Sequence, residues 1–153
     1  MARTVREIFD AAIHLIDAQN ESTGSTDTTD TKEYKVRAAK LLSTLLNEAY
    51  PYSDTWSPAE DGTRPTHPPV TELTDEVDMD DFICLSALPA GLAALFVFDE
   101  DKDKYNAFWG DYMNRLAQAR ATLPASSGFE DIENPYSWGG AGAGIEYGQF
   151  GRW

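Results

Sequence analysis

The stretch Phe82-Ile-Cys-Leu-Ser-Ala-Leu-Pro-Ala-Gly-Leu-Ala-Ala-Leu-Phe-Val-Phe98 decides the fold of this chain. It is apolar nearly all round, and a helix of that kind is buried on most of its sides. Acidic residues precede it and suit the positive end of a helix dipole, so we expect the helix to begin near Met79. Pro89, with Gly91 close behind, is expected to kink or split the helix. The apolar run is too short to span a bilayer, and the sequence predicts a buried core helix.

Two amphipathic helices precede this run. The first is expected over residues 5–20, where Thr4 and Glu7 have the spacing of a capping box. The second is expected over residues 31–50, with Asp30 as its N-cap. Their apolar positions recur at helical spacing; they are Val5, Ile8, Phe9, Ala12, Leu15 and Ile16 in the first helix, and Tyr34, Ala38, Leu41, Leu42, Leu45, Leu46 and Ala49 in the second.

A final helix and two long loops complete the predicted fold. The turn 99–104 leads into a helix that reaches about Thr122, with the stripe Tyr105, Phe108, Trp109, Tyr112, Met113, Leu116 and Arg120. Loops are expected at 21–29, which is polar, and at 51–76, which is rich in proline. The sequence therefore predicts an all-α protein, a small four-helix bundle with two long loops.

The bundle, residues 1–124, is followed by an extended C-terminal arm, residues 125–153, rich in glycine and aromatic residues. The glycines from Gly139 onward disfavour a helix, because each costs about 1 kcal/mol in a helix interior. The large apolar side chains favour a segment that becomes ordered on a partner, and a disordered tail is the alternative. Candidate partner-binding residues are Phe129, Ile132, Tyr136, Trp138, Ile145, Tyr147, Phe150 and Trp153, together with Trp56 in the proline-rich loop, which packs either on its own domain or on a neighbour.

The charge balance limits the class of partner. The chain has 26 acidic and 12 basic residues among 153, a formal net charge of -14. Such a surface repels nucleic-acid phosphates and anionic membranes, which disfavours tight wrapping of DNA or RNA. It remains compatible with a conduit along which DNA passes without sticking. The one cysteine, Cys84, lies in the apolar run, so neither a disulfide within the chain nor a zinc site is expected.

No pattern of catalytic or metal-binding residues is found. The alternating acids of 99–103 resemble the start of a calcium loop, but Lys104 stands where that loop needs glycine. The acids of 75–81 are expected to form a solvated face. His14 and His67 have no serine or cysteine nearby in a nucleophile motif. We therefore expect no catalytic residue, no cofactor and no metal site. The sequence predicts that the protein is not an enzyme.

A resemblance to a known family rests on four motifs: Thr4-Val-Arg-Glu-Ile8; Leu41-Leu-x-x-Leu-Leu-Asn-Glu48; Ile83-Cys-Leu-x-x-Leu-Pro-Ala-Gly-Leu-Ala-Ala-Leu95 after the acidic entry; and Phe129-Glu-Asp-Ile-Glu133. Together they resemble the head–tail connector, or adaptor, proteins of tailed bacteriophages. The extension from Ala141 to Trp153 has no counterpart in that resemblance.

The resemblance implies a structural protein of the virion neck, assembled in the host cytoplasm. It implies a homo-oligomeric ring, a dodecamer, beneath the portal protein, which extends the DNA channel and links the capsid to the tail. Stopper or tail-completion proteins would bind the ring, DNA would only pass through it, and no membrane is involved. The C-terminal arm is expected to dock on the portal.

Other functions stay open at this point. The chain is alternatively another neck or tail-completion protein, or a cellular helical adaptor that binds one partner through its arm. A metal-dependent enzyme that uses the acids of 75–81 is a third and less favoured reading.

Overall fold

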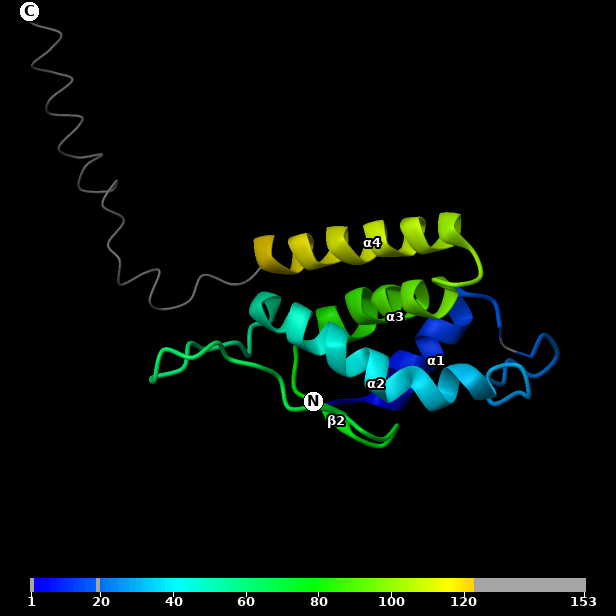
Figure 1. Ribbon diagram of the computed structural model, residues 1–153, viewed down its shortest axis with the longest axis horizontal. Coiled ribbons are helices and arrows are strands. Elements are labelled where there is room, and N and C mark those ends of the chain that lie inside the picture. Colours follow the sequence, from blue (N-terminus) through cyan, green and yellow to red (C-terminus); the bar gives the residue numbers. More distant parts are fainter. Residues whose placement is uncertain (1, 19, 123–153) are drawn as a thin grey trace, which may run out of the picture. The chain divides into compact units, whose positions relative to one another are not determined.

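The computed structural model describes residues 2–18 and 20–122, and in these residues the chain is mostly helical. The described part contains four α-helices and one very small sheet (Figure 1). The elements in order are β1 (Arg3–Thr4), α1 (Val5–Leu15), α2 (Lys32–Ala49), the 3-10 turn η1 (Tyr50–Tyr52), β2 (Glu76–Val77), the π-helical turn η2 (Ile83–Ala87), α3 (Leu88–Val97) and α4 (Lys102–Ala121). The expected arm, residues 125–153, lies outside the described residues.

Helix α3 is the centre of the bundle. It contacts α1, α2 and α4, and it lies between α4 and the other two helices (Figure 1). Nine of its ten residues are buried, which confirms the expectation of a buried core helix. Three large side chains of the apolar run, Phe82, Leu85 and Phe98, are nevertheless exposed, so the run is buried on most but not all of its sides.

Pro89 explains the change of helix type before α3. In a regular α-helix its ring would collide with the carbonyl of Leu85, four residues earlier. The chain instead forms the wider π turn η2, in which the Leu88 N–H donates to the carbonyl oxygen of Ile83, five residues earlier. The expected interruption at Pro89 is thus a switch from π to α geometry, with Pro89 in the first turn of α3.

Helix α1 begins as predicted and ends earlier. Thr4 and Glu7 form the capping box, but the helix stops at Leu15 instead of Asn20. Asp17 takes a left-handed conformation with φ of 57°. The Asp17 and Ala18 N–H groups donate back to His14 and Ile13, which is the Schellman arrangement. The buried stripe consequently includes Ile13, and Leu15, predicted to be buried, is exposed.

The caps of the other two long helices also differ in detail. The N-cap of α2 is Thr31, not Asp30, and the Thr31 hydroxyl donates to the carbonyl oxygen of Thr26 (2.5 Å). Asp101 caps α4, because its carboxylate accepts hydrogen bonds from the N–H groups of Asp103 and Lys104. On α4 the predicted stripe is too wide, since Met113 and Arg120 are exposed and Tyr112, Leu116 and Ala119 are buried.

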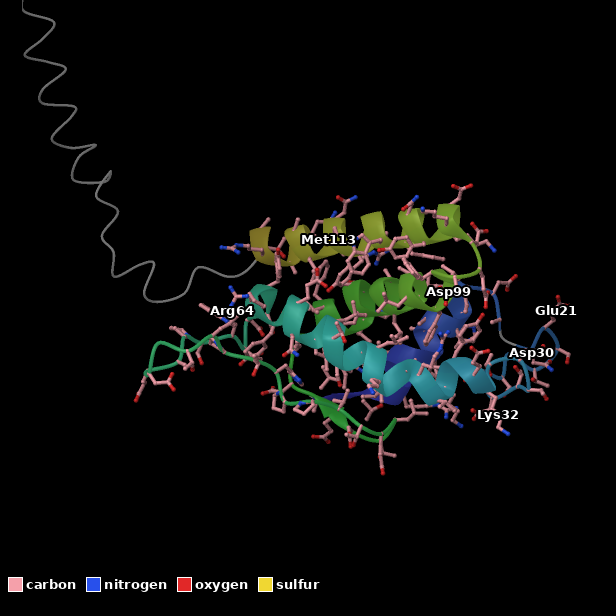
Figure 2. The ribbon with its side chains drawn as sticks, in the orientation of Figure 1. Glu21, Asp30, Lys32, Arg64, Asp99 and Met113 are labelled. Atoms are coloured by element: carbon pink, nitrogen blue, oxygen red, sulfur yellow. The ribbon has the colours of Figure 1, made fainter. Side chains whose placement is uncertain are left out.

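The two loops lie at opposite ends of the helices; Glu21 and Asp30 mark one and Arg64 the other (Figure 2). The second loop returns to the start of the chain, where β1 pairs antiparallel with β2. There the first N–H groups of α1, on Val5 and Arg6, donate to the carbonyl oxygens of Asp75 and Leu73. Backbone donors that a helix start leaves unpaired are satisfied by this loop.

Candidate interaction surface

The long loop brings residues 53–56 against residues 78–80. The Thr55 hydroxyl donates to the carbonyl oxygen of Asp78 (3.1 Å), and the Asp54 N–H donates to the carboxylate of Asp80 (3.3 Å). The Asp80 N–H donates in turn to the Ser53 hydroxyl (3.3 Å). Two segments more than twenty residues apart in the sequence therefore form one surface.

His67 holds the segment 78–80 in place through a hydrogen bond to the backbone of Asp78. Its side chain is buried, and its Nε2 accepts a hydrogen bond from the Asp78 N–H (3.1 Å). Its Nδ1 lies 2.7 Å from the carbonyl oxygen of Pro68 and must donate there. Both ring nitrogens are engaged, so His67 acts as a structural link and has no nitrogen left for acid–base chemistry.

A pocket of about 440 Å³ opens between these segments. Two of its carboxylates are already engaged. Asp80 accepts from the Ile83 N–H (2.9 Å), and Asp81 accepts from Arg3 through both oxygens at 3.0 Å, which lowers the pKa of Asp81. The pocket is lined by Ala2, Asp54, Thr55, Asp78, Met79, Asp80 and Asp81.

Asp54 and Asp78 differ from these two acids. Both are exposed, and neither side chain has an ion pair or hydrogen bond with another described residue. The segment from 54 to 81 holds nine acidic residues and one basic residue. The pocket therefore presents uncompensated negative charge.

Exposed large apolar side chains follow closely in the chain on two of the residues that line the pocket, Thr55 and Asp81. Phe82 and Leu85 precede and enter the π turn and are 44% and 52% exposed. Trp56 follows Thr55 and is 39% exposed. We call Trp56, Phe82 and Leu85, together with Asp54 and Asp78, the acidic–apolar surface. π turns occur frequently at functional sites, because they displace side chains from the regular helical path.

Cys84 is not placed as a nucleophile. Cys84 is fully buried beside Met79, and burial raises the pKa of its thiol to about 12, so the nucleophilic thiolate is disfavoured. Within residues 2–18 and 20–122, no group of His, Cys, Asp and Glu side chains is placed to hold a metal ion. In the same part of the chain, no helix is both long and apolar enough to cross a membrane.

The predicted site residues fall into two sets. Trp56 is on the acidic–apolar surface and partly exposed. The other eight, Phe129, Ile132, Tyr136, Trp138, Ile145, Tyr147, Phe150 and Trp153, lie outside the described residues. The sequence placed Asp78 only in the solvated acidic face of 75–81. It did not single out Asp54, Phe82 or Leu85 as candidate site residues.

Comparison with models of protein families, with curated proteins and with solved structures gives no match for this chain. Its function therefore has to be argued from its own charge, surface and sequence pattern.

Proposed function

We propose that this protein is a structural head–tail connector of a tailed bacteriophage, which forms a ring beneath the portal and extends the DNA channel. In this proposal the C-terminal arm docks on the portal through its aromatic residues. The ring is a dodecamer located in the virion neck, and stopper or tail-completion proteins bind its other side.

The charge distribution carries the proposal. The formal net charge is -14. Of the eleven basic residues within 2–18 and 20–122, four are held in ion pairs with acids, namely Arg3, Arg6, Lys35 and Arg115. The remaining surface is strongly negative. A negative wall repels DNA phosphates, which suits a channel through which DNA moves without binding.

Two further features support the same function. The described residues form a small helical unit with its own core, to which the arm is attached after α4. The arm combines glycine with many large apolar side chains, and aromatic residues are the commonest anchors in protein interfaces. A helical body with an anchoring arm suits a component that links two other assemblies.

The deciding experiment is co-sedimentation with the portal ring encoded in the same genome. Full-length protein is compared with a version that ends at Ser127. We expect the full-length chain to sediment with the portal and the shortened chain to remain in the supernatant. Binding by neither chain would contradict the connector function and favour another neck position or a cellular partner.

The arm can be tested separately by replacing Trp138 and Trp153 with alanine together. We expect weaker portal attachment with unchanged helix content by circular dichroism, because both positions lie outside the helical unit. Normal virion assembly with this double variant would contradict the role of the arm.

A further inference from the structure

We infer that the acidic–apolar surface is a second docking site, for a protein segment that presents lysine or arginine side chains next to a large apolar side chain. This inference concerns a different surface from the arm, and it holds whether or not the arm binds a portal. It is carried by three observations on the described residues.

The first observation is an unpartnered apolar face. Phe82 and Leu85 are exposed in a helical run that is mostly buried, and Ile83 and Cys84 between them are fully buried. Trp56 adds a third partly exposed apolar side chain from the facing segment. Exposed aromatic and aliphatic side chains are typical of the apolar part of interaction sites.

The second observation identifies the chemistry of the occupant. Asp54 and Asp78 line the pocket beside this face and have no cationic partner among the described residues. Asp81 shows how such a partner is held, because it receives Arg3 through two parallel hydrogen bonds. A guanidinium or ammonium group from another protein would complement the two free carboxylates, while its neighbouring apolar side chain covers Phe82 and Leu85.

The third observation is that the surface is held in place before binding. Ser53, Thr55 and the backbone of Asp78 are joined by hydrogen bonds, and His67 supports the Asp78 N–H. A preformed surface loses little conformational entropy when a partner binds. The strong negative charge around it also speeds the approach of a cationic partner.

The test uses the full chain and a short dye-labelled peptide of lysine and leucine, with binding followed by fluorescence anisotropy. The variant D54N/D78N removes both free carboxylates. The control E21Q/D30N removes two carboxylates from the loop at the other end of the helices (Figure 2), so the net charge is identical. We expect D54N/D78N to weaken binding about fivefold and the control to change it less than about twofold.

The contribution of the apolar side chains is tested by comparing two serine variants. L85S should weaken binding of the lysine–leucine peptide several-fold. V36S, at a position that is 79% exposed on α2, should leave it unchanged. A matched lysine–serine peptide should bind the unaltered protein more weakly than the lysine–leucine peptide does.

Several results would overturn the inference. Equal weakening by D54N/D78N and E21Q/D30N would show that only the overall charge attracts the peptide. Equal affinity for the lysine–leucine and lysine–serine peptides would remove the apolar face from the site. Sedimentation of the protein alone gives a further test, because self-association that D54N/D78N or L85S abolishes would make a second copy the occupant.

Discussion

Gly91 lies where α3 packs too closely on its neighbours to admit a side chain. A Cβ atom built on Gly91 would lie 2.9 Å from Cδ2 of Tyr112 and 3.2 Å from Cδ1 of Leu45. Tyr112 and Leu45 are both buried and have little room to move. We therefore expect G91A to lower the free energy of unfolding by about 1–3 kcal/mol, although alanine is the better helix former.

Gly110 provides the matched control for that substitution. It lies on the outer side of α4, and a Cβ atom there would meet no other atom within 4 Å. G110A should therefore raise the free energy of unfolding by about 0.5–1 kcal/mol in urea titrations followed by circular dichroism. If G91A were stabilising as well, α3 and α4 would have to lie further apart than described.

Tyr112 also contains an unsatisfied polar atom. Its hydroxyl is buried without a hydrogen-bond partner among the described residues, and burial raises the pKa of the phenol. Removing a buried and unpaired hydroxyl abolishes a desolvation cost of about 1 kcal/mol or more. Y112F should therefore be as stable as the unaltered protein or more stable in the same titrations.

Tyr34 provides a comparison for Tyr112, because its hydroxyl does have a hydrogen-bond partner. The Tyr34 hydroxyl donates to Glu100 (2.7 Å), and burial together with that bond raises its pKa to about 12. Y34F should lower the free energy of unfolding by about 0.5–1.5 kcal/mol because a formed hydrogen bond is lost. A loss of stability in Y112F as large as that in Y34F would show that the Tyr112 hydroxyl does have a partner.

At the scale of elements, one side chain attaches the long loop to α2. The Ser43 hydroxyl donates to the carbonyl oxygen of Val70 (2.8 Å) and accepts from the Val70 N–H (3.0 Å). Val70 is buried, so S43A leaves two backbone groups without partners and should cost about 1–3 kcal/mol. Hydrogen exchange should show faster exchange of the Val70 amide in S43A. N47A removes only an exposed bond to the Ser43 carbonyl, and unchanged exchange is expected there.

Ion pairs of Asp27 attach the loop between α1 and α2 to both helices. The carboxylate of Asp27 accepts from Arg6 (2.6 Å) and from Lys35 (2.9 Å), which together lower its pKa from 3.8 to about 2. Because the pKa is lower in the folded state, these pairs stabilise the fold above about pH 4, and their contribution is lost as the pH falls towards about 2. The thermal midpoint of D27N should therefore fall less between pH 7 and pH 2 than that of the unaltered protein. D30N, at an exposed neighbour with no described partner, should follow the unaltered protein, and equal curves for all three would contradict the role of Asp27.

The sequence predicted elements well where local signals decide them. Helix α2 was predicted within one residue at each end, because its apolar stripe is regular and Pro51 follows it. The end of α1 was missed, since Asp17 adopts a left-handed conformation that aspartate takes only occasionally. The exact geometry before Pro89 was equally beyond sequence reasoning, because a kink, a break and a π turn all relieve the same collision.

At the scale of the whole molecule, the acidic–apolar surface shows why the site was harder to predict than the fold. Asp54 and Asp78 come together only through tertiary hydrogen bonds made by Thr55 and Asp80. Phe82 and Leu85 belong to a run whose composition predicts burial on most sides, and composition does not show which of its residues face solvent. Trp56 was predicted as a possible contact residue and is 39% exposed, whereas its neighbour Asp54 was not singled out.

Because the net charge is -14, added salt has two opposing effects on the stability of this protein. Salt screens the repulsion among surplus carboxylates, which favours the folded state, and it also weakens ion pairs such as Arg3–Asp81 and Arg6–Asp27. Ion pairs exposed to solvent contribute little to stability, whereas the surplus charge acts over the whole surface. We therefore expect the thermal midpoint at pH 7 to rise steadily as sodium chloride is added to a low-salt buffer. E21Q/D30N, with two charges fewer, should rise less steeply, and a midpoint that falls with salt would mean that the ion pairs outweigh the repulsion.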